Sequence, residues 1–100
     1  MKLSDKYADR LHTINFRRVT SEAAISIDYH PKLKIIEIEY KPGKVYHYLH
    51  MNREIWDTFL EFANIGEGLG AYINRDFKKM IDERNLDYYE LIVAGKHTNE

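Results

Sequence analysis

The fold of this chain is most constrained by residues 33–51, LKIIEIEYKPGKVYHYLHM, in which two alternating runs flank a Pro-Gly turn. The first run alternates apolar and charged residues, and the second alternates aromatic and other residues around Tyr46-His47-Tyr48. Proline presets φ and glycine accepts positive φ, so Lys41-Pro42-Gly43-Lys44 can reverse the chain direction. The pattern predicts an antiparallel hairpin against which the rest of the chain packs.

The number of residues in the hairpin loop decides which side of the second run is buried. An even loop pairs Tyr40 with Val45 and leaves the tyrosines of the second run beside the glutamates of the first. An odd loop, with Gly43 left-handed in a bulge, pairs Ile38 with Tyr46 and turns both tyrosines of the second run toward the core. Because Pro-Gly suits a type II turn, which fits two-residue hairpins poorly, we favour the odd loop with buried or half-buried tyrosines.

The remaining periodicities predict the other elements. An antiparallel meander is expected from three strands with short turns, over residues 21–29, 33–40 and 45–51. Asn52 is a suitable N-cap for a helix that reaches Ala63, and a second amphipathic helix is expected to begin near Ala71. Residues 86–94 can add a last extended segment. The fold class is therefore α+β, a three- or four-stranded antiparallel sheet (meander) with two helices packed on one face.

Length and composition indicate one domain. A chain of 100 residues with 44% apolar side chains can bury one core but not two. We expect a single domain over 19–94, an N-terminal arm or short helix over 1–18, and a polar tail over 95–100. With 15 basic and 16 acidic residues, no net charge draws the chain toward nucleic acid or a membrane, so such binding needs a local patch. Without a long apolar run, a cytoplasmic location is expected and membrane binding is not.

Catalytic and metal sites find no support in the sequence. The chain has no cysteine, which excludes disulfides and thiolate chemistry. His47 and His50 are three residues apart on an expected strand and so point to opposite faces, and His30 with Asp28 is a pair, fewer than the ligands of a zinc site. No serine lies in a nucleophile-elbow context. We expect a non-catalytic protein with no metal and no cofactor.

A series of short motifs resembles the KTSC domain family. The motifs, in order, are Ser26-Ile27-Asp28-Tyr29, Ile36-Glu37-Ile38-Glu39-Tyr40, a glycine turn, Tyr46-His47-Tyr48, a helix, and Gly70-Ala71-Tyr72-Ile73-Asn74-Arg75. The family takes its name from a domain at the C-terminus of some lysyl-tRNA synthetases and also occurs as small stand-alone bacterial proteins. The resemblance covers roughly residues 19–84. It implies a small α+β module without known catalytic residues, for which attachment to a synthetase suggests binding of RNA, with tRNA as the first candidate.

The candidate contacts for nucleic acid are basic, aromatic and amide side chains: Arg17, Arg18, Tyr46, Tyr48, Tyr72, Asn74, Arg75, Lys78 and Lys79. The cations would bind phosphates, and exposed tyrosines would stack on bases. Each also has a purely structural interpretation, because strand tyrosines are common core residues and helix charges are commonly solvated. Asn74 would either bind a ligand or cap the neighbouring loop.

Two further surfaces are suggested by the sequence. Gly66, Gly68 and Gly70 precede a helix, where free N–H groups attract anions, although a flexible turn followed by a solvated helix face is the favoured interpretation. The alternative to RNA is a protein partner or a second copy of the chain, bound to the sheet face opposite the helices. Leu33 and Ile35 would otherwise be exposed on that face beside glutamates.

Overall fold

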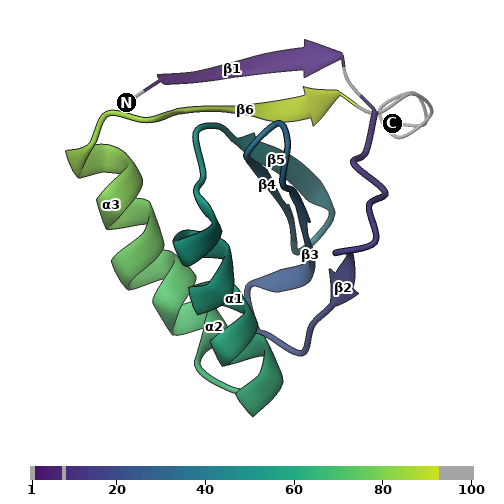
Figure 1. Ribbon diagram of the computed structural model, residues 1–100, viewed down its shortest axis with the longest axis vertical. Coiled ribbons are helices and arrows are strands. Elements are labelled where there is room, and N and C mark those ends of the chain that lie inside the picture. Colours follow the sequence, from purple (N-terminus) through teal and green to yellow (C-terminus); the bar gives the residue numbers. More distant parts are fainter. Residues whose placement is uncertain (1, 8, 93–100) are drawn as a thin grey trace.

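The computed structural model describes residues 2–7 and 9–92, and within them the strands form one six-stranded sheet (Figure 1). The strands are β1 (Lys2–Tyr7), β2 (Arg17–Arg18), β3 (Ala24–His30), β4 (Ile35–Tyr40), β5 (Lys44–Tyr48) and β6 (Asp87–Ile92). Their order across the sheet is β1-β6-β5-β4-β3-β2. Strands β2 to β6 pair in antiparallel fashion, and β1 pairs parallel to β6. The α+β class is confirmed, but the sheet is wider than the three or four strands expected.

The difference in strand number arises at the two edges. The segment expected over 86–94 is extended and forms β6, whereas β1 and the two-residue β2 were not expected. The helical alternative for residues 1–18 is wrong, because residues 2–7 pair along β6 and cover the edge that β6 would otherwise expose. Ile14, an apolar residue of this N-terminal segment, is fully exposed. The tail expected over 95–100 lies outside the described residues.

The β4–β5 hairpin has the odd register. Ile38 lies opposite Tyr46, and Tyr40 lies opposite Lys44, which leaves a three-residue loop. Gly43 in this loop has φ of +144°, a conformation open to glycine but outside the expected left-handed helical region. As this register requires, Tyr48 is buried and Tyr46 is half-buried.

Two helical segments cover one face of the sheet (Figure 1). Helix α1 (Arg53–Ile65) begins at the expected cap, where Asn52 Oδ1 accepts a hydrogen bond of 3.0 Å from the Ile55 N–H, and ends at the left-handed Gly66. The second segment is continuous and begins two residues before the expected position. It consists of α2 (Leu69–Ala71), the π-helical η1 (Tyr72–Phe77) and α3 (Lys78–Glu83).

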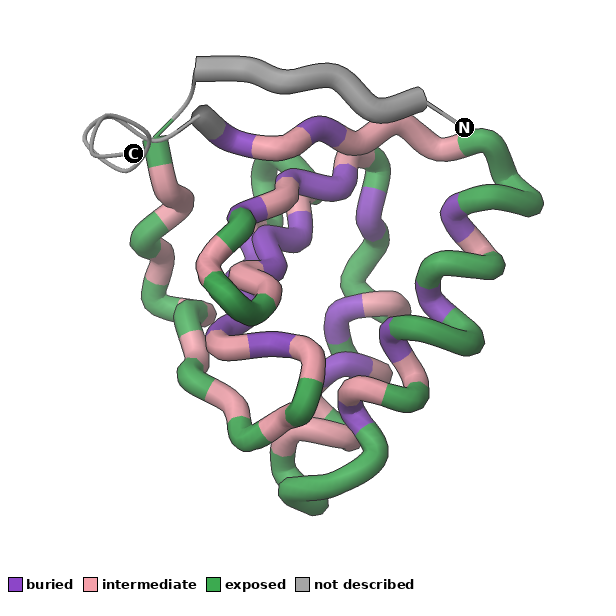
Figure 2. Tube along the Cα trace, turned by 180° about the vertical axis from the view of Figure 1, so that it is seen from behind, coloured by how far each residue is buried: buried purple, intermediate pink, exposed green. Residues whose placement is uncertain are grey.

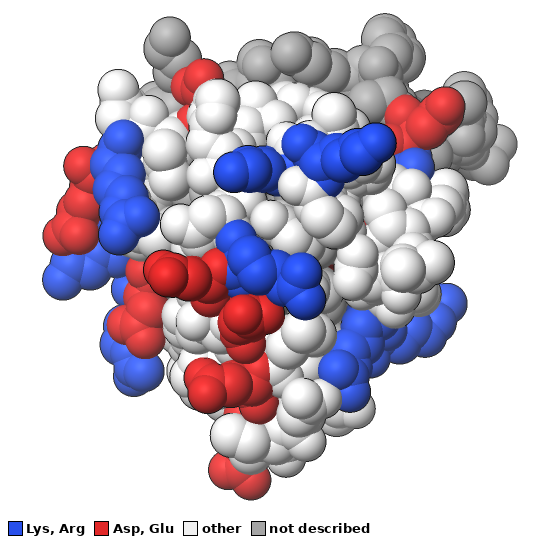
Figure 3. Space-filling model, viewed as in Figure 1, with Lys and Arg blue, Asp and Glu red and all other residues white. Residues whose placement is uncertain are grey.

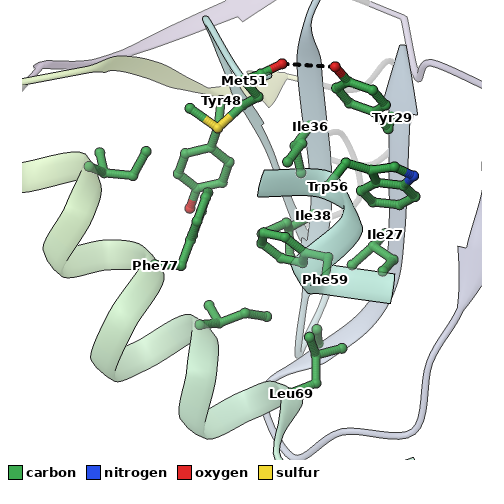
Figure 4. Packing of buried hydrophobic residues seen from close by; sticks show 13 residues of the cluster. Ile27, Tyr29, Ile36, Ile38, Tyr48, Met51, Trp56, Phe59, Leu69 and Phe77 are labelled. Carbon is green, nitrogen blue, oxygen red and sulfur yellow. Dashed lines mark hydrogen bonds between the residues drawn. The ribbon is translucent and has the colours of Figure 1, made fainter. Parts of the chain in front are cut away.

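The apolar core fills the space between these helices and the sheet (Figure 4). Trp56 and Phe59 of α1 and Phe77 of η1 are almost fully buried there. The Tyr29 ring stacks on Trp56 with centroids 5.5 Å apart, and its hydroxyl donates to the Met51 carbonyl over 2.9 Å. Figure 2 shows buried residues along the strands and the inner sides of the helices. The core therefore fixes the second helical segment above β4, β5 and β6.

Residues 9–16 of the chain lie over part of the other face of the sheet, across β3 and β4. Arg10 Nε donates to Glu37 Oε1 over 2.8 Å, and the backbone N–H of Leu11 donates to Glu37 Oε2 over 3.0 Å. Thr13 donates from its backbone N–H and its hydroxyl to the carboxylate of Asp28. The expectation that Glu37 lies on an open face is wrong, because this segment shields it from solvent.

Candidate functional site

A pocket of about 530 Å³ opens between the strands β4, β5 and β6 and helix α3. Its lining combines aromatic rings with cations. The tyrosines are Tyr40, Tyr46, Tyr48 and Tyr88, the cations are Lys41, Lys44 and Lys78, and the other polar side chains are Asn74 and Asp82. We call this the tyrosine-lysine pocket.

The strand register brings the four tyrosines together. Tyr48 lies opposite Tyr88, and Tyr46 is two residues from Tyr48 on the same face of β5. The rings of Tyr48 and Tyr88 stack with centroids 5.2 Å apart, and Tyr46 meets Tyr40 edge to face at 5.4 Å. Cross-strand aromatic pairs of this kind stabilise a sheet as well as shape its surface. The wall of the pocket is consequently built from tyrosine rings in mutual contact.

Two of these tyrosines form a hydrogen-bonded floor. The hydroxyl oxygens of Tyr40 and Tyr48 are 2.7 Å apart. Burial raises the pKa of both hydroxyls well above the ordinary value of 10, so both are neutral at physiological pH. Tyr48 is only 3% exposed and supports the wall, whereas Tyr46 and Tyr88 are half-buried and present part of their surface to the pocket.

The helical side of the pocket comes from the second helical segment. Asn74, Lys78 and Asp82 follow one another at four-residue intervals, which places them along one side of a helix. The Lys78 ammonium lies over the Tyr40 ring, 4.9 Å from its centroid, in a cation–π contact. This contact joins the helix to the floor of the pocket.

The pocket is a local concentration of positive charge. Three lysines and one aspartate line it, although the whole chain carries a formal charge of −1. Figure 3 shows basic and acidic side chains interspersed over the face seen there, without a large area of one sign. An anion with a planar ring matches this combination of ammonium groups and aromatic surfaces.

Four of the nine candidates from the sequence lie together in the pocket: Tyr46, Tyr48, Asn74 and Lys78. The other five line neither this pocket nor the second one described below. Tyr72 stacks on Phe62 with centroids 4.9 Å apart, and burial raises its pKa to about 12. Arg75 pairs with Asp76 over 3.3 Å, and Lys79 is exposed. Arg17 and Arg18 form β2, which β3 separates from the strands that carry the pocket tyrosines.

The loop glycines belong to a second pocket of about 880 Å³. Gly66, Gly68 and Gly70 line it, together with Glu22, Glu67, Lys41 and Asn74. Two carboxylates and one ammonium give its lining a negative charge, which disfavours an anion at the loop. The Asn74 side chain forms no hydrogen bond with the residues that the structure describes, so the loop-capping role expected as one alternative is not seen.

Sequence reasoning missed five polar or aromatic residues of the pocket: Tyr40, Lys41, Lys44, Asp82 and Tyr88. Two signals for them were present. Lys41 and Lys44 flank the tip of the expected hairpin, and Asp82 follows Lys78 at the spacing of one helical turn. The position of Tyr88 in the pocket could not be predicted from the sequence. It depends on the pairing of β6 with β5, which the local pattern does not specify.

A second missed feature is a row of buried polar side chains on the opposite face of the sheet. Asp28, Glu37, His47 and Tyr89 lie opposite one another across β3, β4, β5 and β6. His47 Nε2 is 2.9 Å from Glu37 Oε2, and His47 Nδ1 is 3.1 Å from the Tyr89 hydroxyl. Since an ionised carboxylate only accepts hydrogen bonds, the Nε2 atom carries a proton.

The surroundings of Glu37 favour its ionised form. Burial opposes ionisation and is the largest single effect, but hydrogen bonds from His47, Leu11 and Arg10 together outweigh it and lower the pKa of Glu37. Neither of the two pockets described above is lined by Glu37 or His47. Among the described residues, no three histidine or acidic side chains are grouped to hold a metal ion. The row thus fastens residues 9–16 to the sheet.

A family model for the KTSC domain matches residues 20–78, which is more than half of the chain. The match includes β3, β4, β5 and α1 and ends at Lys78, so Asp82 and Tyr88 of the pocket lie beyond it. No curated protein matches the chain. No helix within the described part of the chain is long and apolar enough to cross a membrane.

Proposed function

The chain belongs to the KTSC domain family, and we propose that it is a small non-catalytic module that binds unpaired RNA, with tRNA as the first candidate ligand. The observation that carries the proposal is the meeting of four tyrosines and three lysines in one pocket of about 530 Å³. Bases have π-faces that stack on aromatic rings, and phosphates pair with ammonium groups. A nucleotide carries both groups on one molecule.

The half-buried rings offer the stacking surface. Tyr46 and Tyr88 flank the pocket, and the buried Tyr48 lies against both, with centroids 6.2 Å and 5.2 Å away. A base stacked on such a ring contributes about 1–3 kcal/mol to binding, with little dependence on which base it is. Tyr48 is too buried to stack on a base itself and keeps the outer rings in place.

The three lysines at the pocket would bind the phosphates next to the stacked base. Lys41 and Lys44 come from the hairpin loop and its flank, and Lys78 comes from the helix, so they surround the opening from two elements. Three contacts to a single strand predict a log-log salt slope of about −2. Because the whole chain is nearly neutral, three lysines alone give only weak, nonspecific binding to RNA. Stronger binding requires a defined site such as the pocket.

The experiment is fluorescence anisotropy of labelled single-stranded RNA and of tRNA, at low and at physiological salt. Lys78→Glu and Lys79→Glu are a matched pair, because both residues are exposed neighbours on α3 but only Lys78 lines the pocket. We expect saturable binding that is lost with Lys78→Glu and retained with Lys79→Glu. Absence of binding at low salt, or equal loss in both variants, would contradict the proposal.

The alternative function is a protein contact or a homodimer. Leu33 is 61% exposed and Ile14 fully exposed, which supports an apolar contact at the β3–β4 turn or along residues 9–16. Against it, residues 9–16 already occupy the neighbourhood of Glu37 and Asp28 on the second sheet face. Light scattering during size exclusion decides the homodimer version, because a monomer at high concentration excludes it.

A further inference from the structure

Asp82 places a carboxylate at the edge of the tyrosine-lysine pocket, beside Tyr88. It lines the pocket one helical turn after Lys78. Burial, then Tyr46 and Asp82, raise the pKa of Tyr88, which reflects the proximity of the carboxylate to this ring. Within the described residues Asp82 forms no ion pair, although Asp57 and Asp76 each pair with an arginine. An acidic group among three lysines does not help to attract a phosphate, so its place in the pocket calls for another explanation.

The chemistry of the bases supplies one. An ionised carboxylate only accepts hydrogen bonds, and it has two oxygens side by side. Guanine presents two adjacent donors on its Watson–Crick edge, N1–H and the N2 amino group, which match the two oxygens. Adenine and cytosine place a ring-nitrogen acceptor next to their amino group, and uracil has one N–H between two carbonyl oxygens. Those acceptors would face the carboxylate and repel it.

We propose that Asp82 makes the pocket selective for an unpaired guanine, which stacks on the ring of Tyr88 or Tyr46 while its Watson–Crick edge meets the carboxylate. This inference rests on the proposed function and adds a base identity to it. Stacking and phosphate contacts bind any nucleotide, whereas a bidentate hydrogen-bonded pair discriminates between bases. Asp82 is accordingly the residue that determines specificity, and the lysines determine affinity.

The test compares four labelled tetranucleotides, UUGU, UUAU, UUCU and UUUU, whose single variable base avoids the association of G-rich strands. Each is titrated against the native chain, Asp82→Asn and Glu83→Gln. The two variants lose the same charge from adjacent exposed residues on α3, but Glu83 does not line the pocket. We expect the native chain to bind UUGU about tenfold more tightly than the other three, as a good bidentate pair provides.

In Asp82→Asn the preference for UUGU should fall to less than about twofold, because an amide offers one acceptor and one donor. Its affinity for UUUU should stay equal or rise, since a negative charge beside the lysines has been removed. Glu83→Gln should keep the tenfold preference. Equal binding of all four tetranucleotides by the native chain, or an unchanged preference in Asp82→Asn, would overturn the selectivity while leaving RNA binding intact. Failure of all four to bind at low salt would overturn the proposed function and the selectivity with it.

Discussion

Glu37 and His47 are hydrogen-bonded to each other across β4 and β5, with Oε2 and Nε2 2.9 Å apart and both side chains at most 3% exposed. They lie on the face of the sheet that the helices do not cover, beneath residues 9–16. A buried carboxylate is tolerated only when its oxygens are hydrogen-bonded, and here three donors do so. The pair therefore links the first part of the chain to the sheet.

Replacing this carboxylate should destabilise the fold. Glu37→Gln keeps the size of the side chain but removes the charge and turns one acceptor into a donor, so Arg10 or His47 loses its partner. We expect the free energy of unfolding to fall by about 2 kcal/mol, the typical cost of a buried polar group left unsatisfied. Urea unfolding followed by tryptophan fluorescence measures it. Glu61→Gln, at an exposed position of α1, is the control, and equal stability of the two variants would contradict the account.

The same pair predicts an acid dependence of stability. The pKa of Glu37 is lowered from its ordinary value of 4.5, so the folded state holds this proton more weakly than the unfolded state. Its contribution is complete above about pH 4.5 and is lost as the pH falls through the folded pKa. Unfolding of the native chain and of Glu37→Gln should be compared at a series of pH values from neutral to acidic. The difference between their free energies of unfolding should shrink below pH 4.5. A difference that grows there would mean that folding raises the pKa of Glu37, and it would contradict the prediction.

Buried tyrosines predict an alkaline dependence as well. Burial raises the pKa of Tyr72 to about 12 from the ordinary value of 10. The contribution of neutral Tyr72 to the free energy of unfolding is complete below pH 10 and is lost as the pH rises from 10 toward 12. In that range only the unfolded chain releases the proton of the Tyr72 hydroxyl. Tyrosinate absorbance at 295 nm and circular dichroism should report a joint transition there. Tyr72→Phe, which cannot ionise, should shift the transition to higher pH, and an unchanged midpoint would exclude this role of Tyr72.

The stacking role of Tyr46 gives a prediction for affinity. Tyr46→Leu keeps an apolar side chain in the half-buried position but removes the ring, and it should weaken RNA binding about tenfold. Tyr46→Phe keeps the ring and should bind like the native chain. Anisotropy titrations of the same labelled RNA measure both. Equal affinity of the leucine and phenylalanine variants would indicate that no base stacks on Tyr46.

The sequence predicted the parts of the fold that depend on local patterns. The register of Ile38 with Tyr46 followed from the number of loop residues, and the start of α1 followed from the capping ability of Asn52. β1 and β2 were missed because their strand character comes from pairing with β6 and β3, and their own residues show no apolar alternation. An edge strand of two residues leaves no periodic signal.

The candidate site was predicted in part for the same reason. Tyr46, Tyr48 and Lys78 stand out within single elements, and the structure brings them to one pocket. Tyr88 joins them through the β5–β6 register, which only the assembled sheet determines. Glu37 was placed on an open face because alternation distinguishes the two sides of a strand but does not reveal that a distant segment covers one of them.

The location of RNA binding is tested most directly by nuclear magnetic resonance. Amide chemical shifts of the ¹⁵N-labelled chain are recorded while an unlabelled single-stranded RNA is added, with the assigned resonances mapped onto the fold. We expect saturable shifts concentrated at the pocket, around Tyr46, Lys78 and Tyr88. Shifts confined to Arg17, Arg18 and residues 9–16, or no shifts at low salt, would contradict the claim that the tyrosine-lysine pocket binds RNA.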